Sequence, residues 1–94
     1  MNDEELALRR KVAAAERARA YIEDPLMVAA FEALDAKYLM AWRNSPADQP
    51  DMRERLWLYL QAIAEVRAEL GRVLEDGMLA RERLDEISAG ITNP

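Results

Sequence analysis

Apolar residues recur at steps of three and four along most of the chain, and no segment alternates apolar and polar positions. Steps of three and four are the helical period, so the pattern predicts an all-α protein with three to four helices. Only three glycines and four prolines interrupt the 94 residues, which favours long helices with short connections.

The prolines indicate where the helices begin and end. Asp24 before Pro25 predicts that one helix stops and a second restarts, because aspartate caps a helix and proline fits its first turn. The segment from Asn44 to Pro50 reads as a loop, since proline disfavours helical angles in the residue before it. Gly77 either ends the third helix or lies inside one continuous helix, and a break or kink is favoured. The tail from Thr92 to Pro94 is expected to fray. One domain, 1–94, is therefore expected, with helices at about 3–22, 25–43, 50–76 and 78–89.

The expected first helix is rich in alanine and arginine. Asn2 and Glu5 have the spacing of a capping box at its start. Its apolar stripe is narrow and mostly alanine: Leu8, Val12, Ala15, Ala18 and Ile22. Such a stripe buries little area, so we expect this helix to be exposed or to need a partner.

The expected third helix has the strongest pattern in the sequence. Steps of 4, 3, 4, 3, 4 and 3 form a heptad seam, and a second apolar row lies beside it. The face is too wide for one partner helix, so we expect two neighbours. The short loop favours an antiparallel hairpin between the second and third helices, within an oligomeric bundle.

Two tryptophans extend the candidate interface. Trp42 and Trp57 fall at the ends of the second and third helices that the loop joins. Core packing explains them better than a ligand pocket, and an exposed tryptophan would indicate a protein contact site. The candidate protein interface comprises Met52, Leu56, Tyr59, Ile63, Val66, Leu70, Val73, Trp42 and Trp57.

The composition argues against most enzyme chemistry. The chain has no cysteine and no histidine, and its hydroxyl groups outside tyrosine are those of Ser45, Ser88 and Thr92. Thiol nucleophiles, histidine-dependent triads and histidine or cysteine zinc sites are excluded. The carboxylates Glu75, Asp76, Asp85 and Glu86 read as solvated helix surface. We therefore expect no enzyme activity, no cofactor, no metal and no small-molecule substrate.

Membrane and nucleic-acid partners are less favoured than protein partners. The longest charge-free hydrophobic run, 56–64, is short of the roughly 20 residues of a membrane span, and no leader is expected. The net charge of -5 opposes general binding to nucleic acid. Residues 1–22 nevertheless carry the only local excess of positive charge, and the nucleic-acid contacts considered are Arg9, Arg10, Lys11, Arg17 and Arg19.

The segment from about Ile22 to Leu84 resembles small helical proteins encoded among the capsid, portal and packaging genes of tailed phages. The resemblance rests on the phrase EDPLMVAAFEALDAKYLMAWRNSPADQPDMRERLWLYLQAIAEVRAEL followed by GRVLEDGMLARERL. It covers about two-thirds of the chain and carries no catalytic motif. The resemblance implies a role in virion structure or assembly, in the virion or the host cytoplasm.

The leading hypothesis is a non-enzymatic helical interaction protein of a phage or prophage. It would act by homo-oligomerisation or by docking on another phage structural protein. One alternative is a DNA-packaging or nucleic-acid-associated factor that uses the basic first helix. Another is an acidic phage inhibitor of a host defence protein.

Overall fold

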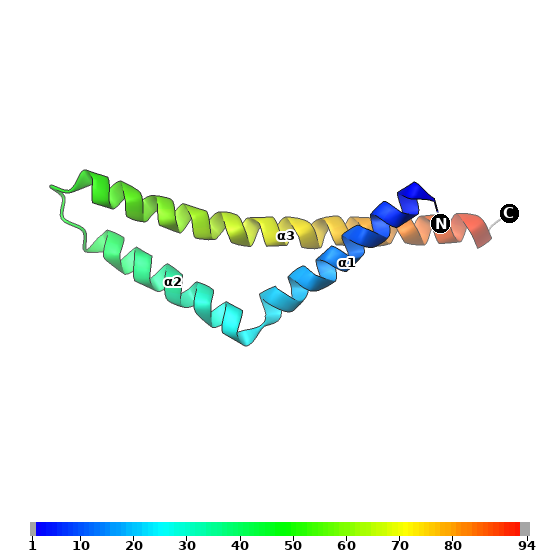
Figure 1. Ribbon diagram of the computed structural model, residues 1–94, viewed down its shortest axis with the longest axis horizontal. Helices are drawn as coiled ribbons and strands as arrows, with labels where there is room; N and C mark the ends of the chain where they lie inside the picture. Colours follow the sequence, from blue (N-terminus) through cyan, green and yellow to red (C-terminus); the bar gives the residue numbers. More distant parts are fainter. Residues whose placement is uncertain (1, 93–94) are drawn as a thin grey trace. The chain divides into compact units, whose positions relative to one another are not determined.

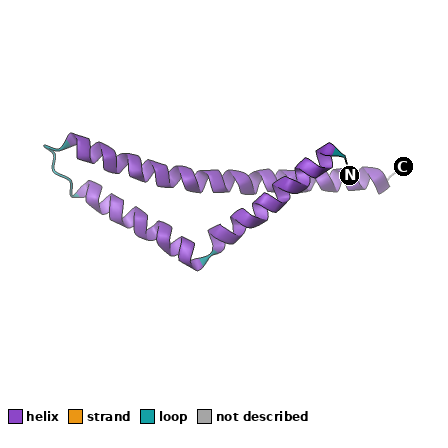
Figure 2. Ribbon diagram, in the orientation of Figure 1, coloured by secondary structure: helices purple, strands orange, loops and turns teal. Residues whose placement is uncertain are grey.

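The computed structural model describes residues 2–92 and contains helices and loops with no strand in that range (Figure 2). Helix α1 spans Asp3–Glu23, α2 spans Pro25–Arg43 and α3 spans Pro50–Thr92 (Figure 1). The all-α prediction is confirmed, with three helices. Residues 93 and 94, in the tail that was expected to fray, lie outside the described residues, and Thr92 belongs to α3.

Side-chain caps fix the starts of the first two helices. Asn2 Oδ1 accepts a hydrogen bond of 2.7 Å from the backbone N–H of Glu5. Asp24 has an extended backbone, and its Oδ1 accepts bonds of 2.9 and 3.0 Å from the N–H groups of Leu26 and Met27. These bonds satisfy N–H groups that have no partner inside the helix. The predicted restart at Pro25 is therefore confirmed.

The predicted break at Gly77 is wrong. Helix α3 runs through this position without interruption for 43 residues, and Gly77 does not have a positive φ. The reason is its neighbour: a Cβ added at Gly77 would lie 2.1 Å from Ala15 Cβ and 3.2 Å from the Lys11 carbonyl oxygen. Glycine stays helical here because α1 crosses too closely for any larger residue. The predicted end at residue 89 is also wrong, since α3 continues past Gly90 to Thr92.

The chain forms two compact units. Unit 1 combines the described residues of Met1–Ile22 with those of Leu70–Pro94, and unit 2 is Glu23–Glu69. Unit 1 is thus made from α1 and the later part of α3, whereas unit 2 is made from α2, the loop and the earlier part of α3.

The two units have different interiors. In unit 1, Ala18 and Ala80 are buried at 4% and 2% exposure, and Gly77 is buried with them. In unit 2, no residue from Glu23 to Glu69 is buried, although Phe31, Tyr38 and other large side chains are half-buried. Unit 1 therefore has a small core of the smallest residues, and unit 2 has an incomplete core of large ones.

Candidate functional site

Aromatic rings join the two helical segments of unit 2. The ring centroids of Tyr38 and Tyr59 lie 5.2 Å apart, and those of Trp42 and Trp57 lie 6.3 Å apart, both pairs tilted. Such tilted arrangements are favourable for aromatic rings and add to the burial of their area. Residues later in α2 contact residues earlier in α3, so the two segments run in opposite directions.

Two arginines of α3 also join these segments. Arg53 lies with its guanidinium 5.0 Å from the Trp42 ring centroid, and it donates to Ser45 at 3.1 Å and 2.9 Å. Arg67 donates to the Asp35 carboxylate and lies 5.0 Å from the centre of the Phe31 ring. Arg67 therefore makes both its polar and its aromatic contact on α2, whereas Arg53 contacts an α2 ring and a polar residue of the loop.

The sequence analysis missed these arginines. Arg53 and Arg67 occupy the same heptad position as Leu60 and Leu74, one row of α3 spaced by sevens. That spacing is the signal that could have identified them, because it places both cations beside the apolar seam that meets α2.

The structure divides the predicted α3 interface into two groups. Leu56, Ile63, Leu70 and Val73 are half-buried within their own units, as is Trp42 on α2. Met52, Tyr59, Val66 and Trp57 are exposed, with 50% of Val66, 50% of Trp57 and 44% of Tyr59 open to solvent. Leu70 and Val73 belong to unit 1, whereas the other members belong to unit 2.

Large apolar side chains outside the predicted interface are exposed as well. On α2 the most exposed is Leu26 at 77%, followed by Met40 at 58%. On α3 they include Leu58 in unit 2, and Met78 and Leu79 in unit 1. The sequence analysis did not include these residues in the candidate protein interface.

Unit 1 contains an open groove of about 450 Å³ beside the Gly77 crossing. Its apolar part is formed by Val12, Leu74 and Met78, with Ala15 and Gly77 at the crossing itself. Arg81 and Glu16, which lie 3.8 Å apart, are among the charged residues along it. The groove is therefore an apolar strip bordered by an ion pair that joins the two helices.

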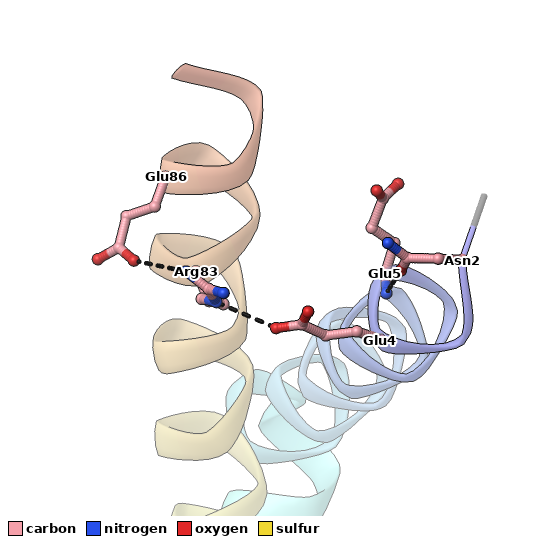
Figure 3. A network of polar contacts seen from close by, with 5 residues as sticks. All are labelled: Asn2, Glu4, Glu5, Arg83 and Glu86. Atoms are coloured by element: carbon pink, nitrogen blue, oxygen red, sulfur yellow. Dashed lines mark hydrogen bonds and ion pairs between the residues drawn. The ribbon is translucent and has the colours of Figure 1, made fainter. Parts of the chain in front are cut away.

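Arg83 connects the two helices of unit 1 near the start of α1 (Figure 3). Its Nε donates to Glu4 at 3.1 Å and its Nη1 to Glu86 at 3.3 Å. The hydrogen bond to Glu4 is the main reason that the pKa of Arg83 lies above its ordinary value, and Glu86 acts in the same direction. This network is solvent-exposed and holds charges in place without creating a reactive group.

The remaining charged residues are dispersed. All five cations considered for nucleic acid, from Arg9 to Arg19, are exposed along α1, with Glu16 between them. Asp76, one of the carboxylates weighed for catalysis, accepts a bond of 2.8 Å from Arg72. Within residues 2–92, no group of three or more acidic, histidine or cysteine side chains could hold a metal ion. No helix in that range combines the length and apolar character needed to cross a bilayer.

Comparison with known proteins adds no relative. The chain matches no protein-family model, no curated protein and no solved structure.

Proposed function

We propose that this protein is a non-enzymatic helical interaction protein that acts by contact with protein partners, either further copies of itself or another protein. Following the resemblance to proteins encoded in tailed-phage gene clusters, its place is in virion structure or assembly. The partner in that setting is a phage structural protein or a second copy.

One observation carries the proposal: large apolar side chains stand exposed in the absence of a large core. The buried hydrophobic residues among those described are two alanines, Ala18 and Ala80. Fifteen large apolar residues are exposed, including Trp57 and Tyr59. Proteins rarely expose extended apolar surface unless it serves a contact, and aromatic residues are enriched where such contacts are strongest.

The chemical inventory supports contact over catalysis. The chain offers no histidine or cysteine, and its carboxylates lie along exposed helix faces without gathering in the described residues. A general acid or base needs a desolvated environment that shifts its pKa toward neutrality. The pKa of Arg83 is raised by its hydrogen bond to Glu4, so this group moves further from neutrality.

Site-specific photo-crosslinking tests the proposal in the 94-residue chain. A photoreactive residue at Val66, 50% exposed on α3, is compared with one at Met40, 58% exposed on α2. We expect crosslinks of one defined mass from position 66, to a further copy or to one other protein, and few from position 40.

Two results would overturn the proposal. One is equal, diffuse crosslinking from both positions, which would mean that exposure alone governs contact. The other is a turnover that disappears when Glu75, Asp76, Asp85 or Glu86 is replaced by the corresponding amide.

A further inference from the structure

In unit 1, the side of α1 that faces away from α3 carries a row of basic and apolar residues. Glu4 contacts Arg83 of α3, Ala15 lies against Gly77, and Ala18 is buried, so these positions mark the inner side of α1. At about 100° per residue, the opposite side carries six exposed residues: Leu6, Arg10, Ala13, Ala14, Arg17 and Tyr21. We call these six residues the basic row.

The later part of α3 carries a row of opposite charge on its own outer side. Gly77 and Ala80 are buried in unit 1 and mark the inner side of this segment. The opposite side carries five exposed residues, which we call the acidic row: Glu75, Met78, Leu79, Glu82 and Glu86. The two apolar members, Met78 and Leu79, are 60% and 62% exposed. Asp85, also exposed, adds negative charge at the edge of this row.

The two rows match in spacing and complement each other in size and charge. Residues 10–17 read R-x-x-A-A-x-x-R, with an arginine at each end and two small residues in the middle. Residues 75–82 read E-x-x-M-L-x-x-E, with a glutamate at each end and two large apolar residues in the middle. The large pair therefore fits over the small pair while two glutamates meet two arginines. Because each pattern is the same from both ends, the match holds for either direction of the helices.

The charges at the ends of these patterns are unpaired in the part of the chain that the structure describes. Four side chains make no ion pair and no side-chain hydrogen bond within residues 2–92: Arg10, Arg17, Glu75 and Glu82. The two rows of one chain do not meet, because they lie on opposite sides of unit 1. These charges are therefore available to a second molecule.

Charges of the opposite sign lie at the margins of the two rows. Beside the basic row, Asp3 is in the first turn of α1, and Glu16 lies 3.8 Å from Arg81 of α3. Beside the acidic row, Arg72 pairs with a carboxylate of α3, and Arg83 pairs with carboxylates of both helices. Each row therefore presents mainly one sign of charge to solvent.

We propose that the basic row of one copy of this chain packs on the acidic row of a second copy. This inference rests on the proposed function and names the partner in it, because a second copy carries the match in spacing, size and charge at once. Met78 and Leu79 of one copy lie over Ala13 and Ala14 of the next, and each arginine meets a glutamate. Since the rows are on opposite sides of unit 1, the contact repeats from copy to copy in a ring or an open chain.

Charge reversal tests this pairing. The double variant Arg10→Glu, Arg17→Glu makes both rows of a chain acidic, and the double variant Glu75→Arg, Glu82→Arg removes the acidic partner for the basic row. We expect each variant alone to self-associate at least about tenfold more weakly than the unmodified chain, because like charges then face each other. An equimolar mixture of the two should associate again, since each altered row meets a row of opposite charge on the other variant.

Sedimentation at about 100 μM protein and low salt measures the association. The unmodified chain should form species larger than a dimer. The matched control is Lys37→Glu, Arg55→Glu, which changes the net charge as much as the α1 variant does but lies in unit 2. This control should associate like the unmodified chain. Circular dichroism of each variant shows whether its helices remain intact.

Three results would overturn the pairing: a monomer or a closed dimer for the unmodified chain, equal weakening in the control, or a mixture of intact helical variants that does not associate. If the unmodified chain is a monomer, crosslinks of one defined mass from Val66 to another protein would leave the proposed function standing. A monomer with equal, diffuse crosslinking from Val66 and Met40 would end both. The two failures are therefore distinguishable.

Discussion

The helical segments of unit 1 and those of unit 2 pack together in different ways. In unit 1, Gly77 and Ala15 allow α1 and α3 to approach closely, and Ala18 and Ala80 are buried beside them. In unit 2, aromatic rings and arginines join α2 to α3, yet no residue is buried. Close approach completes a core with small residues, whereas large residues on two segments leave part of their surface exposed. The units should therefore respond differently to changes in side-chain size.

Adding volume at the crossing in unit 1 should have the largest effect. Replacing Gly77 with alanine puts a Cβ 2.1 Å from Ala15 Cβ, so the helices must separate. We expect a loss of about 2 kcal/mol in the free energy of unfolding, although alanine favours helix by about 1 kcal/mol. Gly71→Ala is the matched control, because nothing lies within 4 Å of its added Cβ, and it should stabilise. Urea unfolding measures both variants, and equal effects would refute the crossing as the cause.

Removing volume from unit 2 should have a smaller effect. Phe31→Ala deletes a half-buried ring that packs beneath the Arg67 guanidinium. We expect a loss of about 1.5 kcal/mol in the free energy of unfolding, which is less than the usual cost of truncating a fully buried phenylalanine. Leu26→Ala, at a residue 77% exposed, should change thermal stability little. A loss as large as that of a buried core residue would show that Phe31 is covered in solution.

The ion pairs of unit 1 should matter least. Arg83→Gln removes the contacts to Glu4 and Glu86, which are exposed and screened by salt. The raised pKa of Arg83 means that its contribution is present across the neutral and mildly basic range and is lost only as the pH rises above the ordinary arginine value. The melting temperatures of this variant and of the unmodified protein should therefore differ by the same small amount across the neutral range. A difference in melting temperature that grows between mildly acidic and mildly basic pH would contradict the assignment of this contribution to the Arg83 contacts.

Local signals in the sequence predicted the helix boundaries well. Asp24 before Pro25 and the prolines around the loop act on their immediate neighbours, so the sequence alone predicts where α2 begins and where α3 starts. The effect of Gly77 depends on Ala15, which is remote in the sequence. When that neighbour is ignored, a glycine at this position indicates a helix break. Local reasoning therefore gave the wrong result at this position.

The candidate site was predictable only in part. The heptad seam predicts an apolar face on α3, but the spacing does not say which half of it meets α2. In the structure Leu56 and Ile63 are half-buried, whereas Val66 is exposed and Tyr59 is exposed although its ring contacts Tyr38 of α2. That division depends on the relative rotation of two helices, which is set by contacts such as Asp35 with Arg67. Such contacts join residues far apart in the sequence.

The close approach of α1 at Gly77 also limits which substitutions this position can tolerate. Every other amino acid carries a Cβ, so no single codon change at this position yields a side chain that fits against Ala15. A saturation library should accordingly reject all substitutions at residue 77 while tolerating most at residue 71. Of the three glycines in α3, the one at the crossing with Ala15 is then the one with the least mutational freedom.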